Sequence, residues 1–287
     1  LSSPGAASKW CSEVRGKDKS IGYVATMGAL HAGHSSLVQR SIVENDATCA
    51  SIFVNPLQFN NPQDLENYPG SLDEDMSILE NLGCDMVFTG TLMEYFPGYT
   101  RMQDIPKVDP GPCAMGLEGE FRPGHLEGVA TIVDRLFRTV GNCSTYFGEK
   151  DFQQTLVVRD LASRLASNGI DIKIVVCPTI REQSGLALSS RNRRMNEGQI
   201  EVSLRISRAL YRARELWVSG VRDTRQIETG MLEHLDCPEI TVEYAAIRDE
   251  YHWTEFHPSH EIKKPRALIA VTVGDIRLID NLSLLQE

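Results

Sequence analysis

Residues 21–40 read Ile-Gly-Tyr-Val-Ala-Thr-Met-Gly-Ala-Leu-His-Ala-Gly-His-Ser-Ser-Leu-Val-Gln-Arg, and this stretch decides the fold of the chain. Its apolar start, residues 21–24, predicts a buried strand, and an amphipathic helix is predicted to begin near Gly33. A strand, a glycine-bearing turn and a helix N-terminus form an anion site, because backbone N–H groups and the helix dipole point at the turn. We therefore expect a phosphate group to bind at residues 27–34.

Two histidines, His31 and His34, lie in this turn and are candidate ligands of the phosphate. Imidazoles three residues apart can both donate to phosphate oxygens, which suits charge that builds up on a phosphorus undergoing substitution. Gly28 and Gly33 allow a phosphate to approach the backbone. The alternative is that one histidine caps the helix while the other packs against it. The pair beside Gly33 favours binding of a nucleotide phosphate.

Composition limits the remaining possibilities. The chain has 287 residues, a net charge of −10 and seven scattered cysteines without Cys-x-x-Cys spacing. The acidic balance argues against a nucleic-acid partner, and no apolar run is long enough to span a membrane. The cysteine pattern indicates neither a disulfide framework nor a zinc site, so we expect reduced thiols and a cytoplasmic location. The start at Leu1 instead of Met suggests a trimmed or processed N-terminus.

Apolar runs and helical patterns alternate through the first half of the chain. Residues 48–54 predict a strand buried on both faces, and Pro56 ends it, which leaves Asn55 and Gln58 in a loop at its carboxyl end. Open α/β sheets bind their ligands at this edge, although a polar loop would explain Asn55 equally well. A helix at residues 73–82 and a strand at 86–89 continue the alternation, which implies a parallel sheet covered on both faces.

A second possible phosphate site follows. A turn-rich loop at residues 117–125 carries Arg122 and His125 and leads into a helix at 128–140. A strand at 145–147, the turn Gly148-Glu149-Lys150-Asp151 and a helix at 152–167 come next, followed by a strand at 172–177. Lys150 can reach a phosphate, and Glu149 or Asp151 can hold a sugar hydroxyl or a metal. Such polar turns are common, so this one gains weight only as the second strand-to-helix turn of the same sheet.

The pattern changes after Pro178. Residues 181–192 form a polar loop with Ser189, Ser190 and Arg191, suited either to fold over a triphosphate or to serve as an interdomain linker. Helices are predicted at 196–218, with Asn196 as the N-cap, and at 224–235. Strands are predicted at 240–247, 267–273 and 276–279. Helices followed by strands indicate a separate α+β domain. We therefore predict two domains, residues 1–178 and 179–287.

Six motifs together resemble the pantoate–β-alanine ligase family, and the resemblance extends from about residue 19 to 281. The His-x-Gly-His element alone marks only the broader nucleotidyltransferase superfamily, whereas several motifs in the right order are far more specific. The motifs are Thr26-Met-Gly-Ala-Leu-His-Ala-Gly-His34, Val54-Asn-Pro-Leu-Gln-Phe59, residues 117–125, Phe147-Gly-Glu-Lys-Asp-Phe-Gln-Gln154, Leu186-Ala-Leu-Ser-Ser-Arg-Asn192 and Arg277-Leu-Ile-Asp-Asn281.

The resemblance implies a two-step ligation: ATP and pantoate give pantoyl adenylate, and β-alanine then displaces AMP to give pantothenate. It implies a Rossmann-type doubly wound parallel sheet that binds ATP and pantoate, a smaller C-terminal α+β lid domain, and a homodimer. It implies catalytic roles for His34, His31, Lys150 and Arg191, and pantoate binding by Gln58 and Gln154 near Asn55 and Arg122. The implied nucleotide contacts are Met27, Gly28, Gly33, Gly148, Glu149, Asp151, Ile180, Leu188, Ser189 and Ser190. Mg²⁺ is expected to be held largely by ATP, with Glu74 and Asp75 as its nearest protein groups.

Three positions depart from the family pattern: Ala25 replaces a proline, Gly70 replaces an arginine, and Ser184 replaces an acidic residue. None of them is an expected catalytic residue, but they bear on substrate affinity. Two other functions remain open at this point: a different small-molecule nucleotidyltransferase, and a catalytically impaired homologue that binds nucleotide. The amides of Gln58 and Gln154 suit a hydroxy acid better than a phosphate, which speaks against the transferase.

Overall fold

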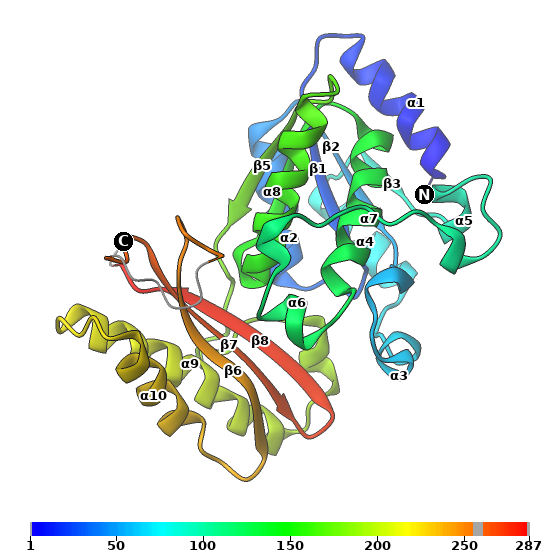
Figure 1. The fold of residues 1–287 in the computed structure, drawn as a ribbon. Helices are drawn as coiled ribbons and strands as arrows, with labels where there is room; N and C mark the ends of the chain where they lie inside the picture. Colours follow the sequence, from blue (N-terminus) through cyan, green and yellow to red (C-terminus); the bar gives the residue numbers. More distant parts are fainter. Residues whose placement is uncertain (1, 255–260, 286–287) are drawn as a thin grey trace. The chain divides into compact units, whose positions relative to one another are not determined.

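The computed structural model describes residues 2–254 and 261–285, and the chain divides into two compact units, Leu1–Pro178 and Thr179–Glu287. The strands of the first unit are β1 (Ile21–Thr26), β2 (Ala47–Ile52), β3 (Met86–Phe88), β4 (Cys143–Gly148) and β5 (Ile172–Cys177). They form a five-stranded parallel sheet in the order β3-β2-β1-β4-β5, which confirms the predicted α/β class (Figure 1).

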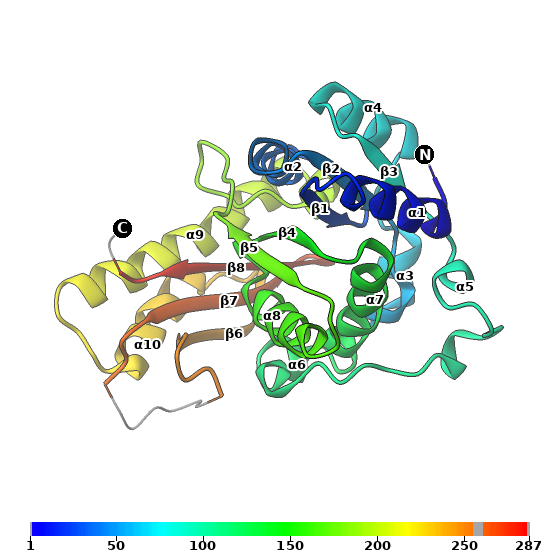
Figure 2. The same ribbon diagram turned by 90° about the horizontal axis from the view of Figure 1, so that it is seen from above.

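Helices cover both faces of this sheet, as the alternating pattern predicts. The principal helices are α1 (Pro4–Arg15), α2 (Ala32–Glu44), α4 (Leu72–Leu82), α7 (His125–Val140) and α8 (Phe152–Ala166). Shorter ones are α3 (Pro62–Glu66), α5 (Leu92–Tyr95) and α6 (Glu118–Phe121). Successive residues of β1 point to opposite faces: Val24 packs in the core under α2 and α4, and Tyr23 packs in the core under α1, α7 and α8. Figure 2 shows α2 and α4 on one side of the strands and α7 and α8 on the other.

Besides the short helices α3, α5 and α6, which the sequence analysis does not predict, α1 and α7 differ from the expectation. The sequence predicts no helix ahead of residue 21, but Ser3 caps α1, and Ala7 and Cys11 are fully buried in the core. Helix α7 begins at His125, earlier than the predicted start at Gly128. Gly128 lies inside α7, and the position requires glycine because a Cβ there would come 2.1 Å from the Leu57 carbonyl oxygen.

The second unit pairs two helices with a three-stranded antiparallel sheet. Its elements are α9 (Glu197–Val218), α10 (Thr224–Leu235), β6 (Ile240–Asp249), β7 (Pro265–Val273) and β8 (Ile276–Ser283), and the strand order is β6-β7-β8. Asn196 and Gln199 form a reciprocal capping box at the start of α9, as the predicted N-cap requires. Side chains from both helices and all three strands share one apolar core.

The strand order places the functional residues of the first unit. The chain proceeds from β1 to β2 and β3 in one direction and later to β4 and β5 in the other, so its topology reverses between β1 and β4. In open α/β sheets ligands bind beyond the carboxyl ends of the strands at such a reversal. The residues after β1, β2 and β4 leave the sheet at that edge.

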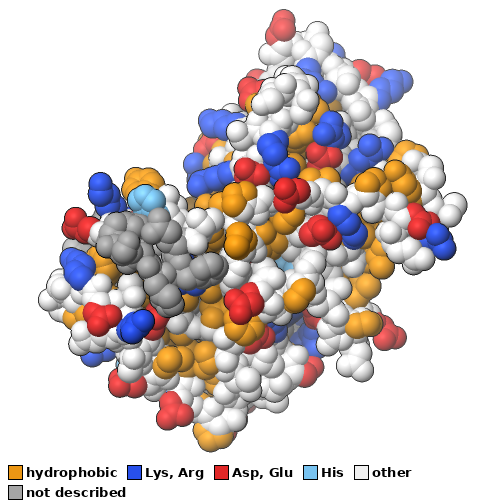
Figure 3. All heavy atoms as spheres, viewed as in Figure 1, with side chains coloured by type: hydrophobic (Ala, Val, Ile, Leu, Met, Phe, Trp, Pro, Cys, Tyr) orange, Lys and Arg blue, Asp and Glu red, His pale blue; other side chains and the backbone are white. Residues whose placement is uncertain are grey.

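On the face drawn in Figure 3, acidic and basic side chains are interspersed over the surface. Within the part of the chain that the structure describes, no helix is long and apolar enough to cross a membrane.

Candidate active site

The turn between β1 and α2 uses its backbone N–H groups internally. Gly28 N–H donates to Thr26 Oγ1 at 3.3 Å, and the Ala29 and Leu30 N–H groups donate to the Asp75 carboxylate at 2.8 and 2.7 Å. Gly33 N–H donates to His31 Nδ1 at 3.1 Å. The turn therefore differs from the expected phosphate cradle, because these four amides already have protein acceptors.

His31 is the N-cap residue of α2, and its ring lies beside that of His34, with 4.2 Å between ring centroids. Because Nδ1 accepts the Gly33 N–H, the neutral ring of His31 carries its proton on Nε2. The capping role proposed as the alternative for His31 is therefore present. A helix cap and a phosphate donor are compatible in one imidazole.

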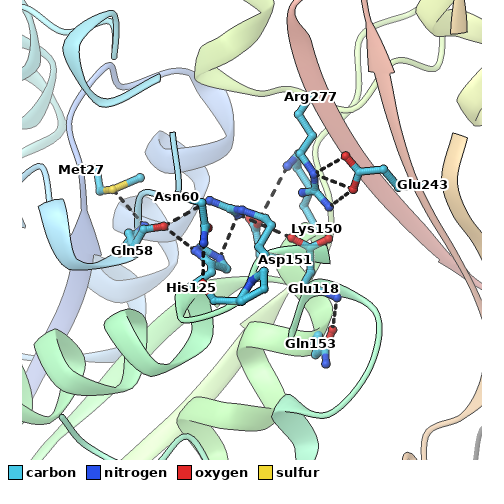
Figure 4. A network of polar contacts seen from close by, with 12 residues as sticks. Met27, Gln58, Asn60, Glu118, His125, Lys150, Asp151, Gln153, Glu243 and Arg277 are labelled. Carbon is cyan, nitrogen blue, oxygen red and sulfur yellow. Dashed lines mark hydrogen bonds and ion pairs between the residues drawn. The ribbon is translucent and has the colours of Figure 1, made fainter. Parts of the chain in front are cut away.

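Gln58 lies in a short 3₁₀ turn, Pro56–Gln58, after β2, and both ends of its amide are held. Its Nε2 contacts Met27 Sδ at 3.1 Å, and its Oε1 accepts from Asn55 Nδ2 at 2.9 Å. Asn55 is 1% exposed and bonds also to the Gly128 carbonyl and the Leu57 N–H. Asn55 thus orients Gln58, and Figure 4 shows the contact between Gln58 and Met27.

The loop before α7 is joined to the same turn by Arg122 and His125. His125 Nδ1 donates to the Gln58 carbonyl at 2.8 Å, and its Nε2 accepts from Arg122 Nη1 at 3.0 Å. Burial, together with the neighbouring Arg122 charge, lowers the pKa of His125 to about 4. The ring is therefore neutral near pH 7, which matches its role as acceptor for a guanidinium. Arg122 also lies 3.5 Å from Glu118.

Residues after β4 add a lysine to this edge of the sheet. Lys150 Nζ lies 3.8 Å from Asp151 Oδ1, with Gly148 and Glu149 in the same strand-to-helix turn. Gln154 is half-buried in the first turn of α8. Its neighbour Gln153 is 3% exposed and bonds to the Glu118 N–H and to the carbonyls of residues 113, 115 and 116.

In the second unit, the expected polar loop forms a short hairpin. Arg181 pairs with Ala187, and Leu188 N–H donates to the Ile180 carbonyl at 2.9 Å. Ser189 caps the 3₁₀ segment Ser190–Arg194 by accepting the Arg191 N–H at 3.3 Å. Ser184 lies exposed near the hairpin tip, 3.4 Å from Glu182 Oε2. Residues 188–191 are thus presented from a hydrogen-bonded hairpin.

The acidic residues expected near a metal have different environments. Glu74 is exposed in the first turn of α4, whereas Asp75 is 2% exposed and accepts two backbone N–H groups. Within residues 2–254 and 261–285, no cluster of three or more His, Cys, Asp or Glu side chains could hold a metal ion. The residues present therefore do not form a metal site made of protein ligands alone.

Three contributors escaped the sequence analysis: the two hydrogen bonds of Asp75, the loop contacts of Gln153 and the thioether of Met27 against Gln58. The motif around residue 154 contains both glutamines, but adjacent helix positions point about 100° apart. The motif alone could not tell which glutamine is buried.

Comparison with known proteins identifies the relatives of this chain. A family model described as pantoate-beta-alanine ligase matches residues 1–283. Pantothenate synthetase of Bacteroides thetaiotaomicron is 40% identical over 270 residues, covering 94% of this chain and 93% of the relative. That of Rhodopirellula baltica is 39% identical over 276 residues, covering 96% and 95%.

Solved structures agree with the sequence relatives. Pantothenate synthetase from Thermus thermophilus is similar with a TM-score of 0.86 and 36% identity, over 100% of this chain and 99% of that one. Pantoate-beta-alanine ligase from Francisella tularensis, solved with beta-gamma ATP and beta-alanine, gives a TM-score of 0.78 and 31% identity, over 99% and 97% of the two chains.

Proposed function

Because this chain belongs to the pantoate–β-alanine ligase family, we propose how its residues divide the work of the ligation. The protein is an ATP-dependent ligase that condenses pantoate with β-alanine to form pantothenate. In the family reaction the pantoate carboxylate attacks the α-phosphorus of ATP, and pyrophosphate leaves. The amine of β-alanine then attacks the acyl carbon of pantoyl adenylate, and AMP leaves.

The first step needs donors more than it needs a base. A carboxylate that approaches the α-phosphorus meets like charge, and positioned donors and cations stabilise the charge that develops in the transition state. We assign this role to His34 and His31, with Lys150 and Arg191 as cations. The Nε2–H of His31, set by the helix cap, supports the assignment.

Pantoate binding is assigned to Gln58 and Gln154, with Asn55 and Arg122 behind them. The observation that carries this assignment is the fixed amide of Gln58, held by Met27 on one side and Asn55 on the other. An amide with both ends anchored loses little conformational entropy when a hydroxy acid binds. Because β1 and β2 are adjacent and parallel, Gln58 and the histidine pair leave the sheet at the same edge.

The remaining assignments follow the resemblance. Nucleotide contacts are proposed for Met27, Gly28, Gly33, Gly148, Glu149, Asp151, Ile180, Leu188, Ser189 and Ser190. Mg²⁺ is proposed to arrive on the ATP phosphates, because the described residues offer no protein-only site. The resemblance gives Glu74 and Asp75 as its nearest protein groups, and of the two only Glu74 is exposed. A homodimer in the cytoplasm is also proposed, and the cysteines, which lie in the described part of the chain as thiols, suit a reducing compartment.

One assay tests the function against its rivals. AMP formation is followed with ATP and pantoate, with and without β-alanine, and product nucleotide is analysed. Turnover that requires both substrates and yields AMP supports the ligase. Pyrophosphate release with nucleotide retained on the product would indicate a different nucleotidyltransferase, and ATP binding without turnover would indicate an impaired homologue.

A further inference from the structure

We propose that Asp75 is a positioning residue that fixes the turn carrying His31 and His34, and that this is its task in place of binding Mg²⁺. The inference rests on the ligase function proposed above. Asp75 lies in the first turn of α4 with 2% of its surface exposed. Its carboxylate is thus buried against the turn that carries the histidines.

The contacts of the carboxylate are divided between two successive amides. Oδ2 accepts from Ala29 N–H at 2.8 Å, and Oδ1 accepts from Leu30 N–H at 2.7 Å. Ala29 and Leu30 are themselves buried, so water cannot replace these bonds without a rearrangement of the turn. Each carboxylate oxygen therefore accepts from one buried backbone amide.

The turn needs such an outside partner because its backbone is unusual. Gly28 has a φ of +78° and Ala29 a φ of +52°. Both residues are therefore in the left-handed region, and Ala29 adopts it although it carries a Cβ. Such conformations persist where the surroundings hold them. A Cβ at Gly28 would lie 2.7 Å from Asp75 Oδ2, so the close approach of the carboxylate also requires the glycine.

The histidines follow directly. Leu30 precedes the cap residue His31, whose ring bonds to Gly33 N–H and lies beside the ring of His34. A change in the dihedral angles of residues 28–30 therefore rotates the cap and moves both imidazoles. Asp75 touches neither substrate nor metal in this scheme, and it acts on the chemistry through the turn.

The test compares Asp75→Asn with Asp73→Asn, an exposed carboxylate in the same helical turn. The asparagine in Asp75→Asn would keep the side-chain volume and one oxygen acceptor. Its NH₂ group, however, would face one of the two backbone N–H groups, which is a donor facing a donor. We expect kcat to fall at least tenfold in Asp75→Asn while KM for β-alanine changes less than twofold. Asp73→Asn should behave as the wild type. The Mg²⁺ concentration for half-maximal activity should be the same in all three proteins, and histidine NMR signals should shift in Asp75→Asn alone.

Gly28→Ala gives a second route that leaves α4 intact, in case Asp75→Asn fails to fold. Its Cβ displaces the carboxylate from the turn, so the same loss of kcat is expected, and the double variant should lose little more than either single one. Wild-type kcat in both single variants overturns the proposal. So does an Asp75→Asn enzyme whose kcat recovers at high Mg²⁺, because that result identifies a metal ligand. Absence of ligation in the wild type and in Asp73→Asn would instead refute the function itself.

Discussion

Arg181 and Asp280 form a two-pronged ion pair that ties the start of the hairpin in the second unit to strand β8. Arg181 Nη1 lies 2.5 Å from Asp280 Oδ2, and Nη2 lies 2.9 Å from Oδ1. The same guanidinium donates to the carbonyls of Gly185 and Asn281. Asp280 and Asn281 belong to a motif that the resemblance marked without giving it a task, and this pair supplies one: it holds the segment that carries residues 188–191.

Replacement of Asp280 by Asn should loosen that hairpin. Asp280 is 5% exposed, so the variant leaves a poorly paired guanidinium and should lower the free energy of unfolding by roughly 3 kcal/mol. KM for ATP should rise if the hairpin binds nucleotide as proposed. Asp275→Asn is the control, because it removes an exposed partner of Arg194 and should cost less than about 1 kcal/mol. Denaturant unfolding and steady-state kinetics give both quantities.

The two roles assigned to His31 can be separated. His31→Asn keeps a side chain that caps helices well, so stability should stay within about 0.5 kcal/mol, while loss of the Nε2 donor should lower kcat. His31→Ala removes the cap as well and should cost about 1 kcal/mol of stability. His34→Ala should slow adenylation by roughly a hundredfold, the effect of losing a transition-state donor. Pyrophosphate release measures the step, and wild-type rates in His34→Ala would refute its catalytic role.

Gln58→Ala should raise KM for pantoate about tenfold, the equivalent of one hydrogen bond, and leave KM for β-alanine unchanged. Asn55→Ala should act in the same direction, because it frees the Gln58 amide on one side. It should also destabilise the protein, since the Gly128 carbonyl loses a donor. Asn60→Ala serves as a control in the adjacent loop, where the amide is exposed and bonds to the Pro123 carbonyl. Equal KM values for pantoate in all four proteins would argue against the assignment.

The folded protein should lose stability as the pH falls from about 6.5 to about 4. In this window the unfolded chain protonates His125 while the folded chain does not, because burial lowers its pKa to about 4. The unfolded state therefore binds more protons, and unfolding becomes easier by up to roughly 3 kcal/mol below pH 4. His125→Asn should flatten this part of the stability profile. Urea unfolding at a series of pH values measures the slope.

Gly70→Arg should strengthen binding of an anionic substrate. The nearest atom to a Cβ at Gly70 is the Ala29 nitrogen at 3.7 Å, an ordinary contact, so the position accepts a Cβ without displacing the turn. The added charge should lower KM for ATP or pantoate by about two- to fivefold, and roughly 0.5 M salt should reduce the gain. Gly70→Gln adds similar length without charge and should leave KM unchanged. A gain of the same size in Gly70→Gln would attribute the effect to packing.

Local patterns predicted the elements that local chemistry determines. The apolar run at residues 21–24, the cap at Asn196 and the long buried strands all appear in the structure close to their predicted bounds. Helix α1 was missed, because its first turn is made of small residues without an apolar period, and its burial depends on α7 and the sheet. Tertiary packing decided that element.

The sequence predicted which edge of the sheet carries the candidate residues, but not the contacts that they make. Because Gln58, Lys150 and the histidine pair each follow a predicted parallel strand, the sequence places them at one edge of the sheet. The acceptor for Ala29 and Leu30, however, comes from Asp75, 46 and 45 positions further along the chain. The residues around the turn give no sign of such a partner. The generic expectation of free amides before a helix is therefore wrong for Ala29 and Leu30, because a carboxylate distant in the sequence accepts from both.

The internal bonding of the turn between β1 and α2 has a consequence for inhibitors. A loop whose amides are vacant attracts any oxyanion, and simple phosphate or sulfate then competes with the substrate. Here four of those amides are already engaged by Thr26, Asp75 and His31. A compound that hydrogen-bonds to these four amides must displace the acceptors that they already have. Selective compounds should instead address the imidazole edge of His31 and the anchored amide of Gln58.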